Sequence, residues 1–256
     1  MEQHTCLNCR NKFEDKFCNQ CGQQTTHRYT VAHVFHEVTH VFTHADKGIF
    51  SFAWHIISKP GIVALDLVEG KRKRYFNLFQ FLLLIVGVTT FLISKTDFIV
   101  QATKTINTTN DVKMSAKLGA AQQEISLLMQ KYNNILQMLL IPIFSLFSWL
   151  FFARKKYNYA ETIVLHTASS AQTNVFAIAT TSLFFLMNNS KGFTIIAVLS
   201  IFVMLFSFTI SYRQFFKFSI GRSFLYAFLV VICTYLIQIV LTAIITILLV
   251  IASGLK

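Results

Sequence analysis

The sequence predicts an all-α fold: a polytopic membrane bundle of about five transmembrane helices with a small N-terminal zinc ribbon and interfacial amphipathic helices. The 256-residue chain is 54% hydrophobic and 14% aromatic, with a mean hydropathy of +0.53, which is too apolar for an ordinary soluble domain. Apolar runs long enough to cross a bilayer recur from residue 75 onward, and most are bordered by basic residues. Four of the five cysteines lie in two close pairs near the N-terminus.

The predicted zinc ribbon occupies residues 1–30, where two Cys-x-x-Cys pairs are separated by eight residues. A two-residue gap lets both thiolates of a pair reach one tetrahedral ion, and two pairs complete a four-sulfur shell. A segment this short cannot bury a useful core, so bound metal must supply its folding energy. Disulfides are disfavoured because we find no secretory signal, and a redox role lacks the surrounding βαβ pattern. The sequence therefore predicts structural Zn²⁺ on Cys6, Cys9, Cys18 and Cys21, with Gly22 in a turn that needs a positive φ.

A histidine-rich amphipathic helix is predicted from Val31 to His44, with apolar residues on one face. Four histidines fall within roughly 80° of one another on the opposite face: His33, His36, His40 and His44. Three interpretations stay open, namely a solvated face, a second metal site and a pH-responsive surface. The run His36-Glu37-Val38-Thr39-His40 also matches the zinc-protease pattern His-Glu-x-x-His, which keeps a metal-dependent hydrolase as an alternative.

The rest of residues 31–70 is predicted to form short cytoplasmic elements at the membrane interface. The apolar run at 49–57 is too short to span a bilayer, and Ser58-Lys59-Pro60-Gly61 predicts a turn after it. A second short apolar piece follows at 62–68. We expect Trp54 to lie at headgroup depth.

Four consecutive cations then precede about eighteen mostly apolar residues: Lys71, Arg72, Lys73 and Arg74. We expect these cations to stay in the cytosol beside anionic lipid headgroups, which orients the first span and every span after it. The formal net charge of +12 comes from such membrane-flanking positions, because residues 1–30 hold four basic and three acidic side chains. We therefore do not expect nucleic acid to be a partner.

These features together resemble a family of uncharacterised multi-span bacterial membrane proteins with an N-terminal four-cysteine zinc ribbon. The resemblance rests on the Phe17–Gly22 end of the ribbon, Pro60-Gly61, the Gly70–Tyr75 segment and the later Asn158–Glu161. It extends to about His166, and the last two spans match only in hydropathy. The resemblance implies the architecture of the chain, and it implies no particular biochemical activity.

The bundle is predicted over residues 71–256, with an external helical loop at 95–133. The first span is expected within the apolar part of 71–94, after the four cations, and the other four at about 134–153 with a kink at Pro142, 162–187, 193–212 and 223–253. From Met114 the apolar positions recur by three and four, which predicts a helix packed on a neighbour or on a second copy of the chain. The basic flanks place the N-terminus in the cytosol and the C-terminus outside.

The third span is the most polar. His166, Ser169 and Thr173 share one helical face, and Glu161 lies at its cytoplasmic end. We take these four residues as a candidate intramembrane polar site, because an ionisable group within a span is a functional candidate. Serine and threonine are also ordinary helix-packing residues, so a tight seam is the alternative.

The sequence favours a non-enzymatic binding or assembly subunit of a membrane complex in the bacterial inner membrane, partnered by another protein or by a second copy of itself. We find no phosphate-binding loop, nucleotide fingerprint or serine-hydrolase pattern. One alternative is an ion or small-molecule transporter that uses the polar face of the third span. The other is the hydrolase, with Glu37 as general base and Glu161 or His166 as further ligands.

Overall fold

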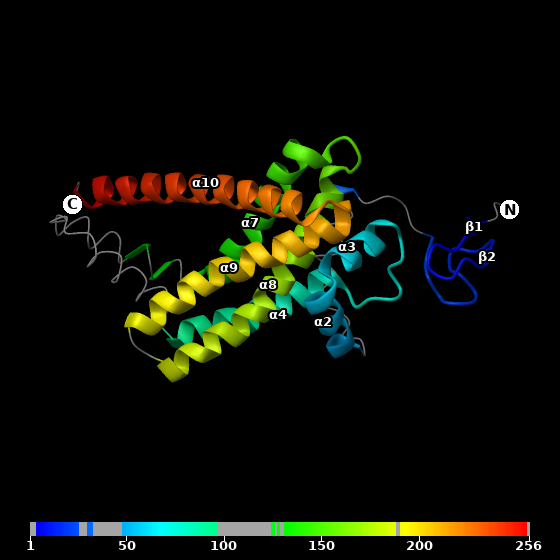
Figure 1. The fold of residues 1–256 in the computed structure, drawn as a ribbon, viewed down its shortest axis with the longest axis horizontal. Helices are drawn as coiled ribbons and strands as arrows, with labels where there is room; N and C mark the ends of the chain where they lie inside the picture. Colours follow the sequence, from blue (N-terminus) through cyan, green and yellow to red (C-terminus); the bar gives the residue numbers. More distant parts are fainter. Residues whose placement is uncertain are drawn as a thin grey trace.

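We describe the protein from a computed structural model that covers residues 4–25, 30–32, 48–96, 124–125, 127–128, 131–187 and 190–254. The histidines at positions 33–44 and most of the predicted external loop lie outside these residues. The described chain forms a small N-terminal head and a bundle of helices, with the head at one end (Figure 1).

The head is organised by turns, with very little regular structure. Strand β1 (His4–Thr5) pairs antiparallel with β2 (Lys12–Phe13), so that His4 faces Phe13 and Thr5 faces Lys12. A single bridge joins Phe17 to Gln24. Within residues 4–25, the described part of the head, the buried apolar residues are Cys6, Phe13 and Cys18, which is too little apolar surface to hold it folded.

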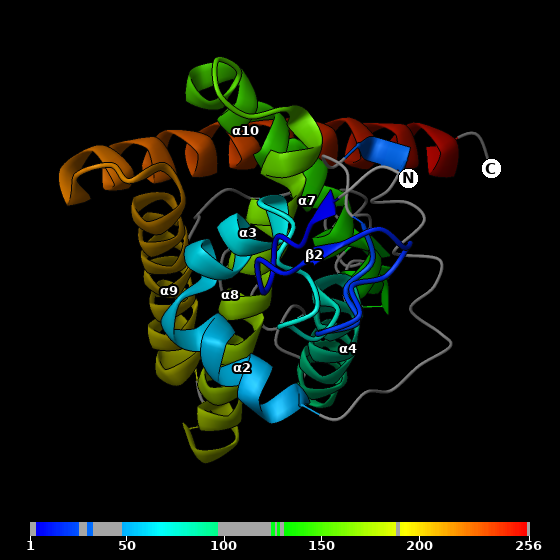
Figure 2. The ribbon, with the colours of Figure 1, turned by 90° about the vertical axis from the view of Figure 1, so that its right-hand side faces the viewer.

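Five long helical elements form the bundle: α4 (Leu78–Thr96), α7 (Asn133–Ser148), α8 (Tyr159–Met187), α9 (Ser190–Phe216) and α10 (Ile220–Gly254). A π-helical turn, η2 (Trp149–Ala153), continues α7, whose interior holds Pro142. Helix α8 is central, because it packs against α4, α7 and α9. Helix α10 contacts α7 and α9 and crosses α9 obliquely (Figures 1 and 2).

Among the described residues, four helices are long and apolar enough to cross a membrane: Leu78–Lys95, Ile135–Ala153, Val198–Phe216 and Ile220–Ile245. They correspond to the first, second, fourth and fifth predicted spans. Helix α8, at the place of the third, has 29 residues but is too polar to be counted with them. Most of the polar side chains near the start of α8 are buried against neighbouring helices. Packing inside the protein therefore keeps them away from any lipid.

The two short apolar elements predicted before the first span are the helices α2 (Ile49–Ser58) and α3 (Pro60–Val68), separated by Lys59 alone. Helix α2 buries Phe52 and Ile56, while Phe50 and Trp54 are 90% and 68% exposed. Helix α3 lies beside α8 and α9 and packs against both (Figure 2), and most of its residues are buried.

The break between α2 and α3 is held by side-chain amides from the bundle. The Gln172 Nε2 atom donates to the Ile57 carbonyl at 2.7 Å, and the Gly61 N–H donates to Gln214 Oε1 at 2.9 Å. Gly61 also touches α9 directly, since a Cβ added there would lie 2.3 Å from the Ser211 carbonyl oxygen. Only glycine fits at this crossing.

Candidate metal centre

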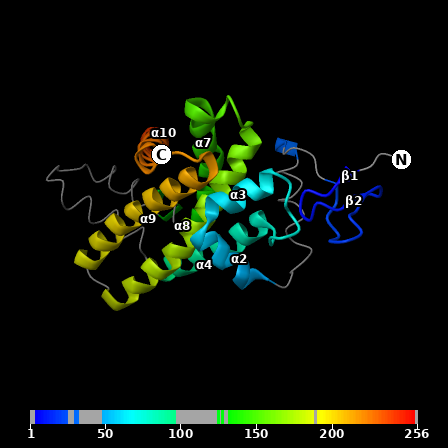
Figure 3. The ribbon, with the colours of Figure 1, turned by 45° about the vertical axis from the view of Figure 1, so that its right-hand side comes forward.

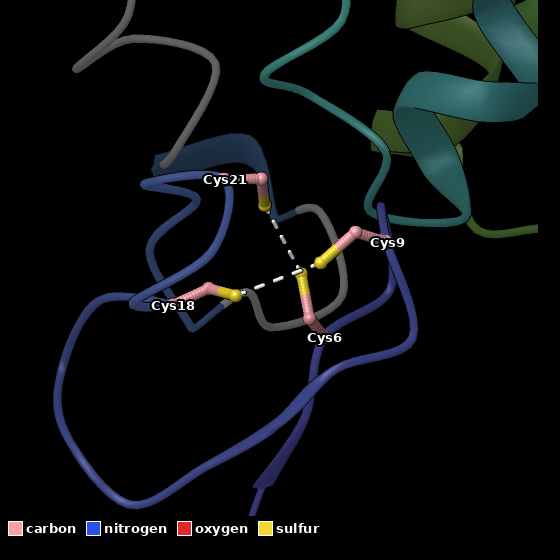
Figure 4. Close-up of side chains that lie close together, drawn as sticks. All are labelled: Cys6, Cys9, Cys18 and Cys21. Atoms are coloured by element: carbon pink, nitrogen blue, oxygen red, sulfur yellow. Dashed lines mark hydrogen bonds between the residues drawn. The ribbon is translucent and has the colours of Figure 1, made fainter.

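The four cysteines of the head converge on one point. Their sulfur atoms all lie within 4.8 Å of one another, with Cys6 Sγ 3.5 Å from Cys21 Sγ and Cys9 Sγ 3.6 Å from Cys18 Sγ (Figure 4). A tetrahedral ion with metal–sulfur bonds of about 2.3 Å places its sulfur ligands roughly 3.8 Å apart. The thiols are therefore spaced as the ligands of a single ion.

Two matching turns bring the cysteines together. In the first, the Cys6 N–H donates to the Asn11 carbonyl and the Arg10 N–H donates to the Cys6 carbonyl, both at 2.8 Å. In the second, the Cys18 N–H donates to the Gln23 carbonyl and the Gly22 N–H to the Cys18 carbonyl, again at 2.8 Å. Gly22 has a φ of 70°, which confirms the predicted turn, and Arg10 holds the equivalent position at 63°.

This equivalence yields a test, because Arg10 adopts a left-handed conformation that costs an L-residue about 1 kcal/mol. We expect Arg10→Gly to slow metal transfer from the head to a chelator by roughly fivefold. The reciprocal variant Gly22→Ala should speed the transfer, because it introduces the same cost in the second turn. The two rates are measured on the full-length protein with a colorimetric chelator. Equal rates for both variants would show that these turns do not hold the site.

The backbone of the second turn favours thiolates over thiols. The Gln23 N–H lowers the pKa of Cys21. Burial acts to raise the pKa of Cys18, but the N–H groups of Cys21 and Gln20 outweigh it and lower that pKa to about 6. Thiolate is the form that binds metal. A tetrahedral set of four thiolates fits Zn²⁺ or iron and is unlike the oxygen shells of Mg²⁺ and Ca²⁺.

The head contacts the bundle through Gln23, which is only 4% exposed. Its Nε2 atom donates to the Gly70 carbonyl, and its Oε1 atom accepts from the Lys73 N–H at 3.3 Å. Gly22 lies beside the same segment, since a Cβ there would be 4.0 Å from Lys73 Cε. The head thus rests on the residues between α3 and α4 (Figure 3). We call residues 70–77 the basic loop.

The predicted membrane-surface cations lie in this basic loop and differ in their surroundings. The Lys71 ammonium pairs with Asp66 and Glu69, each at 2.8 Å, whereas Lys73 and Arg74 are exposed. Tyr75 donates its hydroxyl to the second oxygen of Asp66 at 2.7 Å. At the end of the loop, Asn77 Oδ1 accepts from the N–H groups of Phe79 and Gln80 and thereby caps α4.

The Asp66 network gives stability a defined pH dependence. Burial raises the pKa of Asp66, but hydrogen bonds from Lys71 and Tyr75 outweigh it and leave the pKa below its ordinary value. A depressed carboxyl pKa adds stability above the ordinary pKa of about 4, and this is lost as the pH falls through the lower folded value. We expect the apparent Tm difference between wild type and Asp66→Asn to shrink below about pH 4. A constant difference would contradict this, and Glu69→Gln, which alters an exposed partner of Lys71, should show little difference at any pH.

The second candidate region centres on His166, which is fully buried. Its Nε2 atom lies 2.6 Å from Ser148 Oγ on α7 and 3.2 Å from the Tyr212 hydroxyl on α9, and these two oxygens are 2.6 Å apart. The rings of Phe144 and Phe208 pack on the imidazole. The sequence did not identify Ser148 and Tyr212 as partners of His166. Their only sign in the sequence is a polar side chain within an apolar run.

The other three residues of the predicted polar site have local partners instead. Glu161 forms a capping box with Asn158: the Glu161 N–H donates to Asn158 Oδ1 and the Asn158 N–H to Glu161 Oε2, both at 2.8 Å. Ser169 and Thr173 donate to carbonyls one turn earlier on α8. These hydrogen bonds of Glu161, Ser169 and Thr173 therefore lie within α8 and its N-terminal cap.

The Ser148–His166–Tyr212 contact joins three helices, which predicts a measurable effect on stability. We expect Ser148→Ala to lower it by about 1–3 kcal/mol, because two of the three contacts vanish among fully buried side chains. Ser182→Ala is the matched control, since its hydroxyl donates to the Ile178 carbonyl on an exposed part of α8. The apparent Tm in detergent measures both. If Ser148→Ala matches Ser182→Ala, the cluster does not hold these helices together.

No protein-family model, no curated protein and no solved structure matches the chain. The resemblance to a bacterial membrane-protein family therefore stays a prediction.

Proposed function

We propose that the chain is an integral protein of the bacterial inner membrane whose zinc-bound head acts, on the cytoplasmic side, as a non-enzymatic docking module within a membrane complex. The observation that carries this proposal is the convergence of four thiols through two matching turns. Four protein ligands complete a tetrahedral shell, which leaves no open position at which a substrate could bind. Zinc in such a shell would supply folding energy and no chemistry.

The distribution of basic residues supports the cytoplasmic placement of the head. Pairs of exposed cations flank the helices in three segments: Lys73 and Arg74, then Arg154 and Lys155, then Lys217 and Arg222. Lys59, Lys95 and Lys131 are exposed as well. The first and the last segment lead into α4 and α10 at the end of the bundle that faces the head (Figures 1 and 3). Cytoplasmic flanks of membrane helices are enriched in lysine and arginine, and such residues meet anionic lipid headgroups.

The head also offers a surface for a partner protein or a second copy of the chain. Leu7 and Phe17 are 49% and 53% exposed, although the head has few apolar residues. Two large apolar side chains on a segment of this size favour a contact surface.

Isolation of the protein in mild detergent tests this function. We expect the wild-type chain to elute with a companion protein or as a dimer, and the double variant Leu7→Ser/Phe17→Ser to elute alone with its metal content unchanged. A wild-type chain that elutes as a monomer without a companion would overturn the proposal. So would a companion that the double variant keeps.

The transporter and the hydrolase remain predictions. His166 is enclosed by side chains from α7 and α9. Glu161, which the hydrolase would use as a ligand, is engaged in a helix cap. His36 and His40 lie outside the described residues, so metal analysis decides: a second ion lost in His40→Ala would restore the hydrolase.

A further inference from the structure

We propose that the metal-loaded head holds the basic loop in one conformation through Gln23, a contact that we call the clamp. Loss of the metal would then release the segment that leads into α4. This inference rests on the proposed metal-bound head, and it states that the fold of the head controls the conformation of the basic loop. It concerns residues 4–25 and 70–77, which are far apart in the sequence and lie side by side in the fold (Figure 3).

The clamp contact is made by one buried side chain and two backbone groups. Gln23 donates to the Gly70 carbonyl and accepts from the Lys73 N–H, so both ends of its amide are used. A side chain that bridges two main-chain groups three residues apart holds the backbone between them in one conformation. Gly70, at a φ of 90°, already needs a conformation that most residues avoid.

The metal site places this side chain. Gln23 follows Cys21 by two residues, and its carbonyl accepts the Cys18 N–H within the second turn. The head has too small an apolar core to keep that turn without the ion. Loss of metal would therefore remove the turn and, with it, the position of the Gln23 amide.

The basic loop is tied to the bundle on either side of the clamp. At its start, the Lys71 N–H donates to the Asp66 carbonyl and the ammonium pairs with the Asp66 side chain. At its end, the Tyr75 hydroxyl donates to the same Asp66. Between these anchors the Lys73 N–H points to the head. Release of Gln23 would thus free the centre of the loop, where Lys73 and Arg74 are exposed, for anionic phospholipid headgroups.

Hydrogen exchange on the full-length protein in detergent tests the clamp, read by mass spectrometry on peptides that cover residues 70–76. We expect Gln23→Ala to speed exchange in these peptides by about tenfold, because the Lys73 N–H loses its acceptor. The matched control is Gln20→Ala, which removes an exposed amide from the same turn and should leave exchange unchanged. Gln23→Asn, whose side chain is one methylene shorter, should behave as Gln23→Ala does.

A measurement of the metal content distinguishes a failure of the clamp from a failure of the proposed metal-bound head. We expect Gln23→Ala to keep the wild-type metal content while the loop exchanges faster, and a chelator to raise wild-type exchange to the same level. Wild-type exchange in Gln23→Ala with metal bound would overturn the clamp alone. A wild-type protein that binds no metal would overturn the proposed metal-bound head, whatever the loop does.

Discussion

Cys18→Ser is expected to abolish metal binding and to unfold residues 4–25 while the helices stay folded. Structural zinc contributes apparent binding free energies of about 10–16 kcal/mol to small domains, and a hydroxyl is a poor replacement for a thiolate. The head has no other source of comparable stability, because its buried apolar residues are so few. We therefore expect the metal content per chain to fall from one ion to none, as measured by elemental analysis of protein purified in detergent.

The fifth cysteine provides the control. Cys233 lies in α10 and is not part of the cluster, so Cys233→Ser should keep the full metal content. Limited proteolysis should then cut the head of Cys18→Ser much faster than that of Cys233→Ser, with the helical fragments equally resistant. Metal retained at the wild-type level in Cys18→Ser would contradict a four-thiolate site.

Gly61→Ala should be among the most destabilising single substitutions in the bundle. The added Cβ would lie 2.3 Å from the Ser211 carbonyl oxygen and 2.7 Å from Gln214 Cβ. A backbone carbonyl in the last two turns of α9 cannot move aside as a flexible side chain can, so α3 must separate from α9. Overpacking of this kind costs about 1–3 kcal/mol or more, which we expect to lower the apparent Tm by on the order of 10 °C.

Gly221 is the matched control for this substitution. It lies in the first turn of α10, and a Cβ there would meet nothing within 4 Å. Gly221→Ala should leave the apparent Tm equal or slightly higher, because alanine is the better helix former. If Gly61→Ala unfolds at the same temperature as Gly221→Ala, the close contact between α3 and α9 is not what holds this region.

The cluster of four cysteines could be predicted from the sequence because its members are close together in the chain. Cys6, Cys9, Cys18 and Cys21 lie within 16 consecutive residues, and their spacing alone specifies two metal-binding turns. The four apolar spans could be predicted for a similar reason, since length and composition decide them. In both cases, residues that are close together in the sequence are enough to make the prediction.

The partners of His166 could not be predicted, because they depend on how three helices pack. Ser148 and Tyr212 are 18 and 46 residues away, on different helices. Helical periodicity shows which residues share a face with His166, but it does not show which neighbour that face meets. The prediction therefore grouped His166 with Ser169 and Thr173, which donate to their own helix backbone.

Two further features of the structure have local physical causes. Glu161 was predicted as part of a polar site because it is an acidic residue beside a membrane span, and Asn158-x-x-Glu161 is also the pattern of a helix cap. Helix α3 was predicted as a short element because its apolar run is too short to span a bilayer, and its position at the membrane interface stays a prediction. Its burial against α8 and α9 depends on Gly61, whose close contact with α9 has no signal in hydropathy.

Protease protection of the N-terminal head tests most directly the proposal that this is a membrane protein with its four-cysteine head on the cytoplasmic side. An epitope tag is placed before Met1, and trypsin is added to sealed right-side-out and inside-out vesicles from the same cells. We expect the tag to be lost from inside-out vesicles only, with the protein entirely in the membrane fraction. Loss of the tag from right-side-out vesicles, or recovery of the protein in the soluble fraction, would contradict this arrangement.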